Sequence, residues 1–306
     1  PLLKDPVFRQ MFDIPDRALR REVQSAGSGV IVDAKRGYIL TNDHVIKGAS
    51  TIEVTTKDNR RFKAQIVGRD QATDIALLRI KADNISAVPM GDSDALEVGD
   101  FVLAIGNPFG LGQAVTSGII SALGKTGLGI EGYEDFIQTD ASINPGNSGG
   151  ALVTLDGRLA GINTAILSRN EGNVGIGFAV PINMARLVMN QLITTGEVRR
   201  GRIGVTLRSL PTSSGTSPGA AIEAVESQSA AARAGLMKGD IVTAVNGTAI
   251  RSSSQFRNLI GLMPIGSELE LRYRRGAVNG TARIQIEAPP QTASADRRDR
   301  IGARPN

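Results

Sequence analysis

The stretch Asn144-Pro145-Gly146-Asn147-Ser148-Gly149-Gly150 decides the interpretation, because it sets a serine among glycines between two predicted strands. Glycine adopts backbone angles that other residues avoid, so this turn can aim successive N–H groups at one point. Ser148 is then a candidate nucleophile. The turn Gly146, Asn147 and Ser148 is a candidate oxyanion hole, with the N–H groups of Gly146 and Ser148 as donors. Taken alone, the stretch also fits a polar turn.

A serine hydroxyl needs a base before it can attack a carbonyl carbon. His44 is the single histidine of the 306 residues and follows the predicted strand Tyr38–Thr41. A lone histidine is more often an incidental surface or core residue. The base in turn needs a carboxylate to fix its tautomer. Asp74 directly precedes an apolar run and is the candidate; Asp70 is a rival, and each also fits a turn or cap.

The order of these three residues is more informative than each alone. His44, Asp74 and Ser148 follow one another at separations of 30 and 74 residues. This is the chymotrypsin order on a chain rich in predicted strands. It predicts a mainly β fold with two six-stranded barrels of chymotrypsin type. The histidine and aspartate belong to the first barrel, the serine to the second, and the site to the cleft between them.

Short apolar runs separated by Gly, Asn-Asp or Lys-Asp support this prediction. The predicted strands are Gly29–Val32, Tyr38–Thr41, Thr51–Thr55, Arg61–Val67, Ile75–Arg79, Phe101–Ile105, Ala114–Ser121, Ile137–Asp140, Ala151–Thr154, Leu159–Thr164 and Gly177–Val180. The segment Ile182–Thr195 differs, because its apolar residues recur every four positions before Gly196. It is predicted to be an amphipathic helix with a glycine stop.

Composition excludes several classes of protein. The chain has no cysteine, which excludes disulfides, thiol catalysis and thiolate metal sites. With one histidine, a multi-histidine metal cluster is excluded too, and no cofactor is expected. No apolar run reaches the length of a transmembrane helix. The 35 Lys and Arg against 30 Asp and Glu are scattered, so nucleic acid is not an expected partner.

The chain divides into four predicted parts. Residues 1–26 form a mobile segment with a few apolar anchors, and residues 27–197 form the two-barrel unit. Residues 198–288 form a second, smaller β unit with short helices near Ser229–Ala234 and Ser253–Gly261. Residues 289–306 are rich in Pro, Ala, Asp and Arg and are predicted to be disordered.

Several segments together resemble the HtrA/Deg family of envelope serine proteases, over about residues 27 to 288. They are Thr41–Val45, Thr73–Ala76, Ala104–Gly110, Asn144–Gly150 and Gly175–Pro181. The resemblance selects Asp74 over Asp70 as the triad acid. It implies an ATP-independent serine endopeptidase that degrades unfolded or damaged proteins after small aliphatic residues. His44 is then general base, Asp74 orients it, and Ser148 forms the acyl-enzyme.

The smaller unit is similar to the PDZ domain of that family, through Ala234–Val242 followed by Val245-Asn246-Gly247. It also fits a generic β unit with a glycine-rich turn. PDZ domains bind an extended peptide at a sheet edge and hold its terminal carboxylate with backbone N–H groups. By resemblance, the carboxylate loop is Arg202, Ile203, Gly204 and Val205. Phe256 and Ile260 line the groove or belong to the core, and we expect core.

The resemblance also implies a regulatory loop, assembly and location. Relatives often carry arginine in the loop that senses the activating peptide, whereas this chain has Lys125, which cannot make bidentate contacts. A homotrimer or a multiple of it is expected, with residues 1–26, through Phe8 and Phe12, similar to the loop that joins trimers. The location is the bacterial periplasm, free or anchored to the membrane through a segment outside these residues. The first barrel strand of the family is missing as well, so the first barrel is expected to have an open edge.

Two further expectations concern specificity and alternative functions. In the two-barrel fold, the pocket walls come from the segment before the serine and the strand pair after it. Those segments offer Ile143, Leu167 and Ile176, all uncharged, although at least one of them is expected to be core. The alternative function is a chaperone or peptide-binding module that holds misfolded chains. An inactive protease-like scaffold is disfavoured, because all three candidate triad residues are present.

Overall fold

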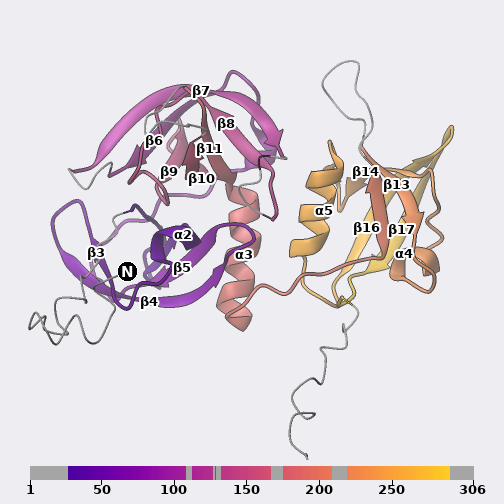
Figure 1. The fold of residues 1–306 in the computed structure, drawn as a ribbon, viewed down its shortest axis with the longest axis horizontal. Coiled ribbons are helices and arrows are strands. Elements are labelled where there is room, and N and C mark those ends of the chain that lie inside the picture. The colour runs from indigo at the N-terminus through magenta and orange to yellow at the C-terminus, as the bar shows by residue number, and fades with distance from the viewer. Residues whose placement is uncertain are drawn as a thin grey trace, which may run out of the picture.

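The computed structural model describes residues 27–107, 112–126, 128, 132–166, 175–208 and 219–289. The expectations for residues 1–26, for Leu167 and for the C-terminal tail from 290 onward lie outside these residues. The described residues form three β-sheets, of which two lie one above the other beside helix α3, while the third lies on the far side of that helix (Figure 1).

The first sheet has five antiparallel strands in the order β1-β2-β5-β4-β3. They are β1 (Val30–Asp33), β2 (Tyr38–Thr41), β3 (Ile52–Thr55), β4 (Arg61–Asp70) and β5 (Ile75–Arg79). The short helix α2 (Asp43–Ile46) follows β2 directly. Within the described residues this sheet has β1 and β3 as open edges, so it is a half-barrel and not the six-stranded barrel predicted from the sequence.

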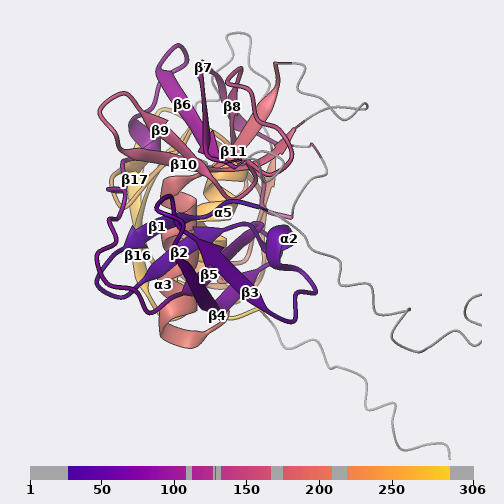
Figure 2. The ribbon, with the colours of Figure 1, turned by 90° about the vertical axis from the view of Figure 1, so that its left-hand side faces the viewer.

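The second sheet is a closed barrel in the order β10-β11-β8-β7-β6-β9. Its strands are β6 (Phe101–Gly106), β7 (Ala114–Lys125), β8 (Phe136–Thr139), β9 (Ala151–Thr154), β10 (Leu159–Ile166) and β11 (Gly177–Pro181). A 3-10 turn, η3 (Ser93–Ala95), precedes it. The barrel lies above the first sheet in both views, and the two sheets face each other across the middle of the domain (Figure 2).

Helix α3 (Ile182–Thr195) begins and ends as predicted. Met184, Val188 and Leu192 lie on its buried face and belong to an apolar cluster that also contains residues of both sheets. Gly196 ends the helix in the left-handed region at φ 76°, and its N–H donates to the Leu192 carbonyl. The helix therefore holds the two halves of the protease-like unit together by burying apolar surface against both.

The third sheet has the order β12-β13-β14-β16-β17 with β15 beside β14. Its elements are β12 (Val205–Arg208), β13 (Ala220–Val225), α4 (Ala230–Arg233), β14 (Ile241–Val245), β15 (Thr248–Ala249), α5 (Ser253–Leu262), β16 (Glu268–Arg275) and β17 (Val278–Gln285). Phe256 and Ile260 are 1% and 5% exposed within a core cluster, so the expectation that they are core is confirmed.

The fold class, a chymotrypsin-like pair of sheets followed by a PDZ-like unit, is confirmed. Strands β2, β5 and β9 have the predicted bounds. Strand β7 runs four residues past its predicted end at Ser121, because it continues to pair with β8 as far as Lys125 opposite Phe136. None of the helices in the described residues is both long and apolar enough to cross a membrane.

Candidate functional site

Predicted site residues His44 and Asp74 lie side by side in the first sheet. His44 lies in α2, which follows β2 in the chain. Asp74 lies directly before β5, and β5 pairs with β2. His44 Nδ1 lies 2.7 Å from Asp74 Oδ2, and the His44 backbone N–H donates to Asp74 Oδ1 at 3.0 Å. The imidazole is half exposed while the carboxylate is 3% exposed. The buried carboxylate therefore orients the imidazole ring through its Nδ1 side.

The backbone at Asp74 is held in an unusual conformation. Its φ is 55°, in the left-handed region that non-glycine residues seldom adopt. Its carbonyl accepts hydrogen bonds from Asn42 Nδ2 at 2.9 Å and from the Asp43 N–H at 3.2 Å. These contacts offset the local cost, which is of order 1–3 kcal/mol for such residues, and they aim the carboxylate at His44.

Thr164, in β10, joins the aspartate to the serine across the two sheets. Its hydroxyl donates to Asp74 Oδ2 at 2.6 Å, and its carbonyl accepts a hydrogen bond from Ser148 Oγ at 3.0 Å. The structure thus brings His44, Asp74 and Ser148 to one place where the half-barrel meets the barrel. Sequence reasoning missed Thr164, since one threonine in a strand carries no pattern that marks it.

The turn around Ser148 leaves two N–H groups uncommitted. The Asn147 N–H donates to the Asn144 carbonyl at 2.9 Å, and the Gly149 N–H donates to the Asn163 carbonyl at 2.8 Å. Among the described residues, neither the Gly146 N–H nor the Ser148 N–H donates a hydrogen bond. Gly146 adopts φ 97°, which only glycine adopts readily. Of the predicted oxyanion-hole residues, Gly146 and Ser148 therefore offer donors, and the Asn147 N–H is already used.

Asp70, the rival for the triad acid, has other partners. Both of its carboxylate oxygens accept from Arg200 Nη2, at 2.9 and 2.7 Å, and one also accepts from Thr73 Oγ1. It thus ties β4 to the segment after α3. A second acid beside the site, Asp43, has its pKa raised by burial, although Arg69 Nε at 3.3 Å opposes the rise.

Two of the three predicted pocket residues can be placed. Ile143 is 1% exposed and belongs to the core cluster of the closed barrel. Ile176 is half-buried against the cluster that includes α3. Gly177, which follows Ile176 in the chain, packs against Ile143, because a Cβ added to Gly177 would lie 2.8 Å from Ile143 Cδ1. Leu167 lies outside the described residues.

The predicted carboxylate loop closes one end of the third sheet. The carbonyls of Arg202, Ile203 and Gly204 accept hydrogen bonds from the N–H groups of Glu287, Ala231 and Glu226, at 2.8 to 2.9 Å. In the described part of the chain, the N–H groups of Ile203 and Gly204 donate none. Gly204 has φ 79°, and a Cβ there would lie 2.2 Å from Ser229 Cβ. Val205 begins β12, which is an edge strand.

Helix α5 contacts the protease-like unit directly. Asn258 Nδ2 donates to the Glu134 carbonyl at 3.0 Å, and Gln191 Nε2 of α3 donates to the Leu262 carbonyl at 2.7 Å. Gly261 faces Tyr133, since a Cβ there would lie 2.8 Å from the tyrosine ring. Helix α5 therefore also touches the segment that joins β7 to β8.

The predicted regulatory residue Lys125 is exposed at the end of β7, where the segment that joins β7 to β8 begins. At the other end of that segment, directly before β8, burial raises the pKa of Asp135 to about 6. Asp94 raises this pKa further and Arg251 opposes the rise. Arg251 Nη2 also donates to the Asp94 carbonyl at 3.3 Å. Asp135, which interacts with both residues, therefore lies where the two units meet.

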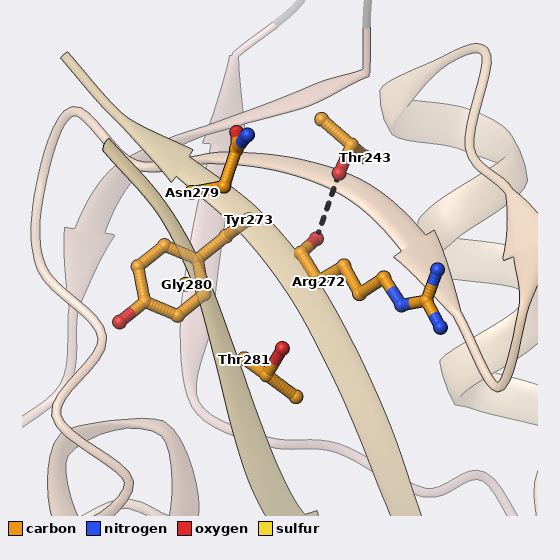
Figure 3. A pocket seen from close by; sticks show the side chains of 6 residues that line it. All are labelled: Thr243, Arg272, Tyr273, Asn279, Gly280 and Thr281. Carbon is orange, nitrogen blue, oxygen red and sulfur yellow. Dashed lines mark hydrogen bonds between the residues drawn. The ribbon is translucent and has the colours of Figure 1, made fainter. Parts of the chain in front are cut away.

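A hollow of about 340 Å³ lies on β14, β16 and β17 (Figure 3). Its lining is Thr243, Arg272, Tyr273, Asn279, Gly280 and Thr281, and none of these is a predicted site residue. Thr243 Oγ1 donates to the Arg272 carbonyl at 3.2 Å, so the threonine hydroxyl is hydrogen-bonded within the sheet. Over the described ranges, no group of three or more His, Asp or Glu side chains could hold a metal ion.

Comparison with known proteins agrees with this arrangement. Residues 27–162 match the trypsin-like peptidase domain model, and residues 201–286 match the PDZ domain model. Together with the fold, these matches define a trypsin-like serine protease unit followed by a PDZ domain.

The relatives specify the family. Periplasmic serine endoprotease DegP of Salmonella typhimurium is 46% identical over 89% of this chain, and the periplasmic pH-dependent serine endoprotease DegQ of Escherichia coli is 44% identical over 94%. The structure of the HtrA-type protease AlgW with tripeptide is 43% identical, with a TM-score of 0.67 over 86% of this chain and 89% of AlgW. The chain belongs to the HtrA family of serine proteases. It spans 59% of the length of DegP and 64% of that of DegQ.

Proposed function

We propose that this chain is a serine endopeptidase that cleaves unfolded or damaged proteins in the periplasm without ATP. The observation that carries the proposal is the link from His44 through Asp74 and Thr164 to Ser148. Ser148 Oγ attacks the scissile carbonyl, and His44 takes its proton and later gives it to the leaving amine. Asp74 holds the ring and stabilises its charged form. The periplasmic location of the relatives supports the compartment.

The N–H groups of Gly146 and Ser148 are the proposed oxyanion donors. Neither donates a hydrogen bond within the described residues, and only Asn147 separates them in the chain. Ile143, Ile176 and Leu167 are the proposed walls of the specificity pocket. None is charged, so a basic or acidic side chain would be buried there without a partner. Cleavage is expected after small aliphatic residues, with soft discrimination among them, since one methylene is worth only about 1–3 kcal/mol.

Peptide binding at the PDZ domain, residues 198–288, is the proposed regulator of residues 27–197. The free N–H groups of Ile203 and Gly204 suit a terminal carboxylate, and the open edge of β12 suits an added strand. The contact from Asn258 to Glu134 offers a route from the groove to the catalytic unit. A peptide with a free carboxyl end is expected to raise kcat/KM, while its amidated form is not.

A homotrimer or a multiple of it is the proposed assembly. Val98, Phe101 and Leu155 are 64%, 63% and 70% exposed, and Phe101 and Leu155 lie next to the paired residues of β6 and β9. Adjacent exposed apolar side chains of this size favour a protein interface. The mass in solution tests this: Phe101→Asp should dissociate the assembly, and Val115→Asp, at another exposed apolar site, should not.

Cleavage of an unfolded protein by the wild type and by Ser148→Ala tests the activity. The variant should lose on the order of 10⁶-fold in kcat, as when a triad acts as a unit. More than a few per cent of residual activity would show that Ser148 is not the nucleophile. The alternative function, holding misfolded chains, predicts that both proteins suppress aggregation and that neither cleaves. Sequencing the fragments tests the pocket, because a majority of cuts after Lys, Arg or Phe would contradict it.

A further inference from the structure

Ser28, just before β1, makes four hydrogen bonds to three other parts of the chain. Its N–H donates to the Ser148 carbonyl at 2.8 Å, and its carbonyl accepts from Thr41 Oγ1 at 2.7 Å. Its hydroxyl donates to the Gly146 carbonyl at 2.6 Å and accepts from the Asn107 N–H at 2.8 Å. The hydroxyl therefore both donates and accepts, and it joins the turn Gly146–Ser148, the oxyanion turn, to the end of β6.

The oxyanion turn needs such a restraint because it is built on glycine. Gly146 has no Cβ, so little in its own structure favours one orientation of its N–H group. The peptide plane between Gly146 and Asn147 is held at both ends, by Ser28 Oγ on the carbonyl and by the Asn144 carbonyl on the N–H. Holding this plane limits the torsion ψ of Gly146, which relates the plane to the Gly146 N–H group on the other side of the Cα.

The surroundings of Ser28 are packed closely enough to transmit that restraint. A Cβ at Gly149 would lie 2.2 Å from the Ser28 carbonyl oxygen and 2.3 Å from Thr41 Oγ1. A Cβ at Gly106 would lie 2.5 Å from Asn147 Oδ1. Because neither glycine has a Cβ, Ser28 packs closely against Gly149, and Asn147 packs closely against Gly106. Since Ser28 belongs to the half-barrel and the turn to the closed barrel, the contact crosses between the two sheets.

We propose that Ser28 is a positioning residue that holds the oxyanion turn in its donating geometry through its hydroxyl group. This inference rests on the proposed endopeptidase activity. Oxyanion donors act because they are aimed before the reaction, and loss of one donor costs about 10²–10³-fold in kcat. Ser28 aims a donor without being one, so its loss should cost less, about 10–100-fold. The loss should fall on kcat, with KM little changed, because the donors bind the transition state more strongly than the substrate.

The test compares Ser28→Ala with the wild type and with Ser93→Ala in the full chain. Ser93 is a matched control, because its hydroxyl also accepts a backbone N–H, that of Asn183 at 3.1 Å, in the same unit but outside the site. For each protein, kcat and KM are measured on one peptide, together with the inhibition constant of a boronic acid of the same sequence. The boronic acid adds to the serine as a tetrahedral anion and so reports on the oxyanion donors.

The proposal expects Ser28→Ala to lose about 10–100-fold in both kcat and boronate affinity, with Ser28→Thr recovering most of both. Unchanged kcat, a loss confined to KM, or an equal loss in Ser93→Ala would overturn it. If Ser28→Ala does not fold, the isosteric pair Ser28→Thr and Ser28→Val decides, since they differ in the hydroxyl alone; equal kcat in that pair would overturn it too. A wild type that cleaves nothing would instead refute the proposed function, and this inference with it.

Discussion

Replacing Asp135 by asparagine should stabilise the protein above about pH 6 and leave its stability near pH 3 unchanged. Burial, with help from Asp94, raises the pKa of Asp135 from 3.8 to about 6, against the opposing effect of Arg251. An acid whose pKa is raised on folding favours the folded state only while it is protonated. That contribution is fully present below pH 3.8 and is lost as the pH rises through about 6.

The size of the effect follows from the two pKa values. The ionised carboxylate costs at most about 3 kcal/mol at pH 8, about 1.6 kcal/mol at pH 5 and about 0.1 kcal/mol at pH 3. Asparagine resembles the protonated acid at every pH. The difference in free energy of unfolding between Asp135→Asn and the wild type should therefore increase by up to about 3 kcal/mol from pH 3 to pH 8.

Urea unfolding at a series of pH values measures this difference, since the effects of groups that do not interact with Asp135 cancel between the two proteins. Asp156→Asn is the control with the opposite sign. Hydrogen bonds from Thr154 and Arg158 lower the pKa of exposed Asp156, so that variant should lose stability, relative to the wild type, as the pH rises from 3. A difference for Asp135→Asn that is flat from pH 3 to 8, or that falls, would refute the argument.

Three other substitutions test the site and the PDZ domain. Thr164→Val removes the hydroxyl that donates to Asp74 and should lower kcat about 10-fold or more while the protein stays folded, as peptide kinetics and circular dichroism would show. Gly204→Ala forces a side chain into a left-handed turn and should abolish binding of peptide C-termini in calorimetry, while retained binding would argue against the loop. Asp240→Ala removes the buried carboxylate that accepts hydrogen bonds from Arg275 and should destabilise the PDZ domain by about 1–3 kcal/mol in thermal unfolding.

The local structure could be predicted from the sequence because the signals for it are local. Short apolar runs separated by Gly, Asn-Asp or Lys-Asp marked the strands, and the four-residue spacing before Gly196 gave α3 its bounds. The order of His44, Asp74 and Ser148 along the chain predicted a chymotrypsin-like pair of sheets. For Phe256 the sequence left two alternatives, groove and core, and the structure confirms the expected one, core.

Tertiary structure alone decided which groups meet. Asp70 and Asp74 are four residues apart, yet one binds Arg200, 130 residues away, and the other binds His44. Thr164 meets Asp74 across 90 residues, and Ser28 meets Gly146 across 118. A hydrogen bond depends on the distance and angle of two groups in space, and no repeat along the chain records which distant groups those are. The sequence by itself therefore determined the elements and the candidate triad residues, and the packing of two sheets determined what holds those residues in place.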